Sequence, residues 1–261
     1  MKKVSALLLA AGHGTRLKPL TMNWPKCLMP IGKYPLLEYW LSNLYTNKIF
    51  DVYVNLHSHN EIVEQFLQRD RFSSWVKPIF EKELLGTAGT LLNLKEKFKN
   101  NTVLLIHADN WSVFNLNDFL NFHFNQRPDN CPITMMTFET NKPEQSGIVE
   151  TNSKGIVTRF HEKIKDPPGN IANAAVYLIE LKEIDQILKM KKITDFSTQI
   201  IPKLIGRIAT WKNNNIHKDI GTKDILKTAQ NDLKPNIYWH EKDNWYINFT
   251  KNPIHKLVKS V

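Results

Sequence analysis

The sequence has 261 residues, 42% of them hydrophobic, and a formal charge of +10. The length suits one large domain or two small ones, and the composition suits a globular protein. No apolar run reaches the roughly 18–20 residues that cross a bilayer, so we expect no membrane insertion. The two cysteines, Cys27 and Cys131, form neither a disulfide framework nor a zinc motif, so we expect reduced thiols and a cytoplasmic protein.

The positive charge is spread along the chain. KEKFK at 95–99 and KMKK at 189–192 are the only dense basic runs, and such runs are usually solvated helix faces. The sequence carries no basic arm, no RGG repeat and no aromatic stripe of the RNA-binding type. We therefore expect no nucleic-acid partner.

The first apolar segment is VSALLLA at 4–10, which leads into AGHGTRL. A basic start before an apolar run is also typical of a secretory signal, and Ala10 and Ala11 could imitate a cleavage site. Cleavage there would remove the segment that best begins a fold, and the cysteine content does not favour secretion. The segment is therefore predicted to be a first strand.

Strand-like and helix-like segments then alternate, which is typical of a mostly parallel sheet covered by helices. The predicted strands of the first half are 4–10, 51–56, 76–80 and 102–108. The predicted helices are 35–47, 60–68, 89–99 and 116–125. Asn60 is the expected cap of the second helix. Further strands are predicted at 132–138, 147–150, 155–160 and 171–180, followed by a mixed helical and strand portion over 182–230.

Residues 231–261 contain several aromatic and basic residues and show no clear period. No internal repeat and no Gly/Ser- or Pro-rich linker divides the chain. The sequence therefore predicts one bilobed domain over 1–230. Residues 231–261 are predicted to be a C-terminal extension, packed on that domain or on a partner.

The glycine stretch AGHGTRL follows the first predicted strand, and ligands of α/β sheets bind beyond the carboxyl ends of the strands. Glycines let the backbone approach an anion closely. The P-loop pattern GxxxxGK[ST] is absent, and the dinucleotide pattern GxGxxG fails because Leu17 holds the third glycine position. GxG alone is equally consistent with a plain turn. Arg16, with Lys26 ten residues further on, adds two cations that suit a triphosphate.

Residues 10–31 match the signature AAGxGTRLxPLTxxxPKxLxPI throughout, and on these residues the chain resembles the sugar-1-phosphate nucleotidyltransferases. Further segments resemble other parts of that family: ELLGTAGTL, LLIHADNW, GIVE, FHEKIKDPP, NIANAAVYLIE, DFSTQIIP and HKDIGTKDILKTA. The resemblance covers residues 4 to about 229 and makes 1–230 a catalytic domain. It implies a Rossmann-like three-layer αβα sandwich, with a mostly parallel mixed sheet and a smaller sugar-binding lobe.

The resemblance also implies a reaction, in which an NTP and a sugar 1-phosphate give an NDP-sugar and pyrophosphate with Mg²⁺ as cofactor. It implies that Asp109 and Asp219 hold the metal and that Arg16, Lys26 and Asp109 are catalytic. Arg16 would hold the β- and γ-phosphates, and Lys26 would stabilise charge at the α-phosphorus. The implied nucleotide-binding residues are Ala10, Ala11, Gly12, Gly14, Thr15, Glu81, Gly86 and Thr87. The implied sugar-phosphate-binding residues are Gly147, Glu162, Lys163 and Asn173.

Plain structural roles remain open for some of these residues. Asp109 and Asp219 are also compatible with a helix cap or a turn, and Glu162 with a surface carboxylate. Two positions depart from the family pattern. His217 stands where an aromatic residue is frequent, and Ala175 replaces a usual glycine in NAGxY, which could change or narrow the sugar pocket. Many family members form oligomers, so a homo-oligomer is compatible with the resemblance, and the sequence leaves the subunit number open.

Glu81 bears on the base, because it lies five residues before Gly86, where family members place a side chain facing the base edge. A carboxylate only accepts hydrogen bonds, and guanine offers N1–H and N2–H₂ on one edge. This favours GTP, with mannose 1-phosphate or a manno-heptose 1-phosphate as acceptor and a product for surface polysaccharide synthesis. The alternatives are a uridylyl-, thymidylyl- or cytidylyltransferase, acting on another sugar phosphate or on phosphocholine. A non-catalytic nucleotide-sugar-binding subunit is an alternative of another class.

Overall fold

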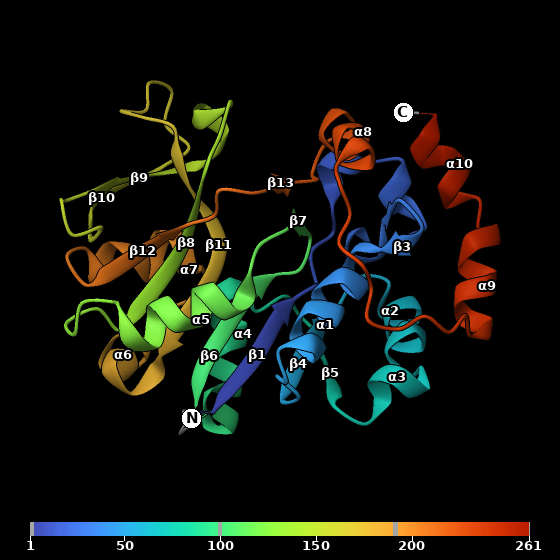
Figure 1. The fold of residues 1–261 in the computed structure, drawn as a ribbon, viewed down its shortest axis with the longest axis horizontal. Coiled ribbons are helices and arrows are strands. Elements are labelled where there is room, and N and C mark those ends of the chain that lie inside the picture. The colour runs from blue at the N-terminus through green and yellow to red at the C-terminus, as the bar shows by residue number, and fades with distance from the viewer. Residues whose placement is uncertain (1–2, 99–100, 190–192, 261) are drawn as a thin grey trace. The chain divides into compact units, whose positions relative to one another are not determined.

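The computed structural model describes residues 3–98, 101–189 and 193–260. The chain forms two compact units, whose elements are labelled in Figure 1. Unit 1 consists of Met1–Leu7, Leu85–Ile106 and Phe114–Asn214. Unit 2 consists of Leu8–Leu84, His107–Val113 and Asn215–Val261. Each unit is thus assembled from three segments that are distant in the sequence.

Unit 1 contains a mixed sheet. Its strands are β1 (Val4–Leu9), β6 (Thr102–His107), β8 (Ile133–Glu139), β9 (Gly147–Thr151), β10 (Val157–Glu162), β11 (Ile171–Glu180) and β12 (Ile208–Lys212). The strand order is β10-β9-β11-β6-β1, and β8 pairs with both β11 and β12. β11 runs antiparallel to β6, β8 and β9, whereas β12 is parallel to β8. The register of β11 shifts between Asn173 and Tyr177, which marks a bulge.

Helices flank this sheet with their apolar residues buried. They are α4 (Gly86–Leu94), α5 (Leu116–Asn125), α6 (Leu181–Leu188) and α7 (Phe196–Gln199), with 3₁₀ turns at Lys95–Phe98, Pro143–Gln145 and Ile201–Leu204. α5 begins at a side-chain cap, because Asn115 accepts hydrogen bonds from the backbone N–H groups of Asn117 and Asp118. Its residues Leu116 and Phe119 are buried three positions apart, as an amphipathic helix requires.

Unit 2 holds the parallel strands β4 (Val52–Leu56) and β5 (Val76–Phe80), in the order β1-β4-β5. Every residue of β4 is buried, which is typical of a parallel strand covered on both faces. The helices of this unit are α1 (Leu36–Thr46), α2 (Asn60–Leu67), α3 (Asp70–Ser73), α8 (Lys223–Asn231), α9 (Asn244–Lys251) and α10 (Ile254–Lys259). Short strands form two further antiparallel pairs: β2 (Pro30–Ile31) with β3 (Tyr34–Pro35), and β7 (Asn110–Ser112) with β13 (His217–Asp219). Three 3₁₀ turns, at Thr15–Leu17, Leu20–Met22 and Lys26–Leu28, carry the chain between β1 and β2.

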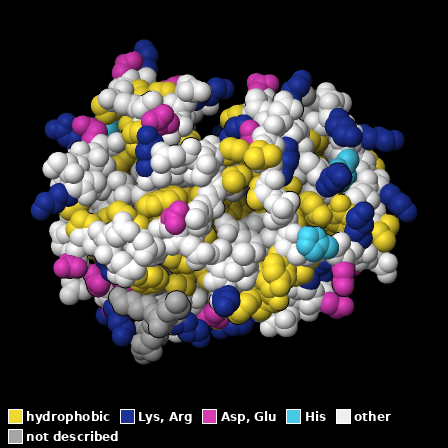
Figure 2. All heavy atoms as spheres, viewed as in Figure 1, with side chains coloured by type: hydrophobic (Ala, Val, Ile, Leu, Met, Phe, Trp, Pro, Cys, Tyr) yellow, Lys and Arg dark blue, Asp and Glu magenta, His cyan; other side chains and the backbone are white. Residues whose placement is uncertain are grey.

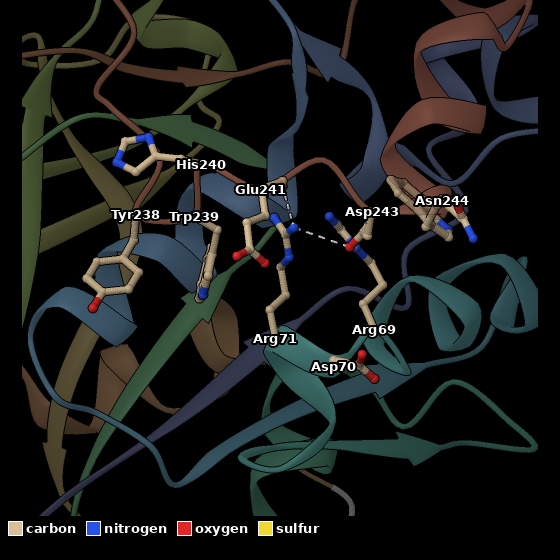
Figure 3. A pocket seen from close by; sticks show the side chains of 10 residues that line it. Arg69, Asp70, Arg71, Tyr238, Trp239, His240, Glu241, Asp243 and Asn244 are labelled. Atoms are coloured by element: carbon tan, nitrogen blue, oxygen red, sulfur yellow. Dashed lines mark hydrogen bonds and ion pairs between the residues drawn. The ribbon is translucent and has the colours of Figure 1, made fainter.

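Residues 231–261 belong to unit 2, where a buried ionic network fixes their first part. Glu38 of α1 has no solvent-exposed surface and accepts hydrogen bonds from Arg69 Nη1 at 2.9 Å and from Arg71 Nη1 at 3.1 Å. Asp243, which caps α9, pairs with Arg69 Nε at 2.8 Å and with Arg71 Nη2 at 3.3 Å. Figure 3 shows Arg69, Arg71 and Asp243 facing one another along a cavity of about 610 Å³.

The α/β class and the mixed sheet flanked by helices are confirmed, as are the helix over 35–47 and the strands at 76–80 and 171–180. Three elements differ from the prediction by more than one residue at an end or in their cap. Asn60 is the first helical residue of α2 and His59 is its cap residue, so Asn60 is not the cap. α4 begins at Gly86, three residues earlier than predicted, and ends at Leu94 before a 3₁₀ turn; Lys99 lies outside the described residues. β10 begins at Val157 because Gly155 adopts a positive φ in the preceding turn.

The distribution of charged side chains and the two free thiols agree with the amino-acid composition. Figure 2 shows Lys and Arg side chains distributed over the face in view, with Asp and Glu side chains among them. Within the described residues, no helix combines the length and apolarity that crossing a membrane requires. Cys27 and Cys131 are both buried free thiols. Burial raises the pKa of Cys27 to about 12, so this thiol is unreactive at neutral pH.

Candidate active site

The loop at residues 10–17 follows β1 in unit 2 and is called the nucleotide loop, after the role that the sequence predicts for it. Ala10 and Ala11 are buried at its start, whereas Gly12 and Thr15 are exposed. Gly14 adopts a φ of 59°, and a Cβ at this position would lie only 2.8 Å from Thr21 Cγ2. Thr21 Oγ1 donates a hydrogen bond to the Gly14 carbonyl at 2.8 Å. Residue 14 must therefore be glycine for reasons of both conformation and space.

Four charged residues of unit 2 meet beside this loop. Lys26 Nζ lies 2.8 Å from Asp109 Oδ2 and 2.7 Å from Asp219 Oδ1, so one ammonium joins the two carboxylates. Arg16 Nη2 contacts the other oxygen of Asp219 at 2.7 Å. The Lys26 side chain is only 5% exposed, whereas Arg16 is 63% exposed. The buried lysine is thus fixed in place, and the arginine reaches into solvent.

Strand pairing brings the two carboxylates together. Asp109 stands in the turn between β6 and β7, and Asp219 ends β13. β7 and β13 are antiparallel with Asn110 opposite Asp219, so the register places the aspartates side by side. Asp232 fixes this pair of strands, because it accepts hydrogen bonds from Trp111 Nε1 at 2.9 Å and from Lys218 Nζ at 2.6 Å.

Gly221 is a residue of this cluster that the sequence reasoning missed. A Cβ at position 221 would lie 2.7 Å from Arg16 Nη2 and 3.0 Å from Asp219 Oδ1. Any side chain there would disturb the ion pair between these two residues. Its place in the segment DIGT, two residues after Asp219, was the available signal.

The electrostatics keep the cluster charged at neutral pH. Burial alone would raise the pKa of Asp219, but the neighbouring Lys26 and Arg16 outweigh it and lower this pKa to about 2. Burial likewise opposes the charge of Lys26, and the two aspartates raise its pKa despite that. The hydrogen bond and charge of Asp219 raise the pKa of Arg16. Arg16, Lys26 and Asp219 therefore face one another in their ionised forms.

The two aspartates also suit a hard divalent cation. Both direct a carboxylate oxygen at one point, the position that the ammonium of Lys26 holds. Among the residues that the structure describes, no group of three or more His, Cys, Asp or Glu side chains could hold a metal. Mg²⁺ characteristically takes one or two protein carboxylates and completes its shell with substrate phosphates and water. The donor set of Asp109 and Asp219 therefore fits Mg²⁺ bound together with a nucleotide.

Glu81, the residue predicted to face the base, is buried at the end of β5. It is 4% exposed, and its Oε1 accepts a hydrogen bond from Asn55 Nδ2 at 3.2 Å. The side chain is thus held in a defined orientation within unit 2.

The remaining predicted residues lie in unit 1. Gly86 has a φ of 79°, and a Cβ there would lie 2.4 Å from the Thr194 carbonyl oxygen. The same carbonyl accepts hydrogen bonds from the backbone N–H groups of Ala88 and Gly89, and Thr87 Oγ1 accepts one from the N–H of Phe196. Gly86 and Thr87 are therefore packed on the segment 194–196.

Three of the predicted sugar-phosphate residues lie on β9, β10 and β11 of unit 1, and Lys163 directly follows β10. Gly147 and Glu162 are opposite each other in the β9–β10 register, and a Cβ on Gly147 would lie 2.9 Å from Glu162 Oε2. Lys163 Nζ contacts Glu162 Oε1 at 3.2 Å. Asn173 donates to the Tyr177 hydroxyl at 2.6 Å and accepts the N–H of Ala175, so its amide shapes the bulge of β11.

Ala175 adopts a φ of 53°, which explains why glycine is usual at this position of the pattern. The left-handed conformation costs a non-glycine residue about 1–2 kcal/mol, and the extra flexibility of glycine in the unfolded chain offsets about 0.5–1 kcal/mol of that. Ala175→Gly is therefore expected to raise the free energy of unfolding by about 0.5–1 kcal/mol, measured by denaturant titration. Ala172→Gly, in the same strand but without a positive φ, is expected to lower it. Equal losses in both variants would contradict strain at Ala175.

The fold and the site define an α/β protein whose first strand leads into a glycine-containing loop beside two cations and a carboxylate pair. Residues 5–236 match the model of the nucleotidyl transferase family, so the chain belongs to that family. It is 28% identical over 236 residues to a mannose-1-phosphate guanylyltransferase of Mycobacterium tuberculosis, a match that covers 88% of this chain and 65% of that protein. The chain thus spans less than two thirds of that relative.

Other similar proteins are named for other nucleotides and for glucose 1-phosphate. A glucose-1-phosphate adenylyltransferase of Bacillus thuringiensis is 28% identical over 280 residues, a match that covers 97% of this chain and 74% of that protein. A solved structure from Bacillus anthracis, described as a "putative glucose-1-phosphate thymidylyltransferase", superposes with a TM-score of 0.79 at 21% identity. That match covers 89% of this chain and 97% of the other, and it supports the Rossmann-like α/β fold.

Proposed function

We propose that this chain transfers a nucleotidyl group from an NTP to a sugar 1-phosphate, which gives an NDP-sugar and pyrophosphate. The observation that carries this proposal is the cluster of Arg16, Lys26, Asp109 and Asp219 beside the nucleotide loop. Such a cluster can neutralise two polyanions, which is the main requirement of phosphoryl and nucleotidyl transfer. The names of the family relatives support the same reaction.

In this reaction an oxygen of the sugar phosphate attacks the α-phosphorus in line. The new P–O bond forms as the bond from the α-phosphorus to the bridging oxygen breaks, and pyrophosphate leaves with the electron pair. The exposed Arg16 holds the departing β- and γ-phosphates through bidentate hydrogen bonds. Lys26, buried and fixed, stabilises the charge that develops around the α-phosphorus. Lys163, which is exposed in unit 1, binds the sugar phosphate, and Glu162 and Asn173 bind sugar hydroxyls.

Asp109 and Asp219 would hold Mg²⁺. When bound, the metal supplies charge neutralisation and Lewis-acid polarisation of phosphate oxygens. The role of the two aspartates themselves is to present ionised oxygens at one point beside the nucleotide loop, a geometry that the β7–β13 register supports.

GTP and mannose 1-phosphate, or a manno-heptose 1-phosphate, are the substrates that we propose. The relative from M. tuberculosis is named for guanylyl transfer to mannose 1-phosphate, and the carboxylate of Glu81, which accepts from Asn55, offers only acceptor atoms to a base, as the donor edge of guanine requires. The experiment is a matrix of GTP, ATP, CTP, UTP and dTTP against a panel of sugar 1-phosphates and phosphocholine, with pyrophosphate release as the readout. Turnover only with another nucleotide would contradict the guanine assignment. No turnover in any combination, from folded protein, would favour a nucleotide-sugar-binding subunit.

Asp109→Asn is expected to lower Mg²⁺-dependent turnover by at least about 10²-fold while the protein stays folded, because it removes one of the two ionised oxygens at the metal position. Pyrophosphate release and thermal unfolding with and without Mg²⁺ measure the two effects. Asp118→Asn, on the exposed first turn of α5, is the control and is expected to retain activity. Unchanged turnover in Asp109→Asn would remove Asp109 from the metal site.

A further inference from the structure

Asn55 of β4 makes two hydrogen bonds in opposite directions from a buried position. Its Oδ1 accepts the backbone N–H of Ala10 at 2.7 Å, and its Nδ2 donates to Glu81 Oε1 at 3.2 Å. Because a backbone N–H can only donate, the amide oxygen has to face Ala10, and the NH₂ group has to face Glu81. The orientation of this side chain is therefore determined by the nucleotide loop on one side and by the carboxylate on the other.

His57, two residues further along, joins the same two parts of unit 2 a second time. Its Nδ1 donates to the backbone carbonyl of Glu81 at 2.9 Å, and its ring packs edge-to-face on the His13 ring at a centroid distance of 5.4 Å. The backbone N–H of Glu81 donates to the Leu56 carbonyl at 2.9 Å. The segment from Asn55 to His57 thus contacts the nucleotide loop at two residues and holds Glu81 through both its backbone and its side chain.

We propose that Asn55 is a positioning residue, which joins the nucleotide loop and Glu81 into one hydrogen-bonded unit and thereby sets the base-binding group relative to the phosphate-binding backbone. This inference rests on the proposed function, in which Ala10 begins the phosphate loop and Glu81 accepts hydrogen bonds from the base. A nucleotide that contacts both the nucleotide loop and Glu81 binds less tightly when the distance between these two groups changes. Loss of the two hydrogen bonds of Asn55 therefore weakens nucleotide binding and leaves the chemical step unchanged.

Asn55→Asp removes one of the two hydrogen bonds and keeps the other, because a carboxylate still accepts the N–H of Ala10 but cannot donate to Glu81. In the wild-type background it is expected to raise KM for the nucleotide by about tenfold or more. The kcat and the KM for the sugar phosphate are expected to stay within about threefold of the wild type.

Glu81→Gln supplies the background that isolates this contact. An amide at position 81 can accept from Asn55, and it can also turn its NH₂ toward a carboxylate at position 55, so donor and acceptor exchange places. Both members of this pair keep a hydrogen bond between positions 55 and 81, although the amide at position 81 turns a different atom to the base in each. Asn55→Asp is therefore expected to raise KM for the nucleotide by a smaller factor in the Glu81→Gln background than in the wild type, which makes the two substitutions coupled.

Two further variants keep the result interpretable. Asn55→Ala removes both hydrogen bonds without adding charge, and it is expected to raise KM for the nucleotide in both backgrounds. Asn213→Asp, at a buried asparagine of unit 1, is the matched control and is expected to leave this KM unchanged. Thermal unfolding of each variant shows which of them are folded.

The outcomes separate the two proposals. An active wild type in which Asn55→Asp raises KM equally in both backgrounds, or not at all in the wild-type background, would overturn the positioning role alone. A folded wild type without turnover for any nucleotide would overturn the proposed function, and this inference with it.

Discussion

Substituting methionine for Lys26 is expected to lower kcat/KM by about 10²–10³-fold, the usual loss when a fixed transition-state charge contact is removed. Methionine keeps the length and most of the volume of the side chain but has no charge. The ammonium lies within 2.8 Å of both aspartates and is nearly inaccessible to solvent, so no other cation of the side-chain cluster can take its place. Pyrophosphate release under saturating Mg²⁺ measures the loss.

The same substitution has a second readout, which does not depend on activity. Without Lys26, the carboxylates of Asp109 and Asp219 repel each other, so Mg²⁺ is expected to raise the melting temperature of Lys26→Met more than that of the wild type. Lys33→Met, on the exposed turn between β2 and β3, is the control and is expected to match the wild type in both measurements. Equal Mg²⁺-induced shifts in Lys26→Met and the wild type would show that the two aspartates do not take up the metal.

Arg69→Met is expected to lower the free energy of unfolding by about 3 kcal/mol, because it leaves Glu38 buried with one cationic partner instead of two. Arg69 is 3% exposed, and its guanidinium lies about 5 Å from the ring centroids of Phe66, Phe72 and Trp245. Its removal also takes one cation away from Asp243, at the start of α9. Denaturant titration measures the loss, and limited proteolysis is expected to cut the segment 231–261 faster.

A compensating substitution tests the cause. Adding Glu38→Gln to Arg69→Met is expected to recover part of the lost stability, because the poorly compensated buried charge is removed. Asp70→Asn, which changes an exposed residue of the same cavity, is expected to alter stability by less than about 0.5 kcal/mol. A double variant that is no more stable than Arg69→Met would assign the loss to the aromatic packing of the guanidinium instead.

The sequence predicted the ends of helices and strands well where the pattern of apolar residues was clear. The strand β5 and the largely buried helix α1 were predicted within a residue, because their runs of apolar and aromatic residues have no competing interpretation. The start of α4 was missed, since Gly86 and Gly89 are poor helix formers. The Thr194 carbonyl, more than a hundred residues later, accepts hydrogen bonds from the N–H groups of Ala88 and Gly89 in the first turn of this helix. The cap of α2 was missed because His59 takes a left-handed conformation that its sequence does not signal.

The charged residues of the candidate site were predictable because a motif with fixed gaps contains Arg16 and Lys26, and because Asp109 follows an apolar strand. The contacts among them were not predictable, since they depend on the β7–β13 register. Gly221 and Asn55 were missed for the same reason. Their importance lies in the space and the hydrogen bonds that other segments require of them, and neither belongs to the quoted signature.

The arrangement around Asp232 has a consequence for the order in which this chain acquires function during synthesis. Lys26 and Asp219 are 193 residues apart, and Asp232 must follow before Trp111 and Lys218 have their shared acceptor. The nucleotide loop and its two cations are therefore synthesised early. Asp219, the second carboxylate, is added only after most of the chain has been synthesised. Closing such a long loop is among the slower and entropically costlier steps of folding. A chain terminated before residue 219 would therefore contain residues 10–17 and both cations but not the complete charge cluster.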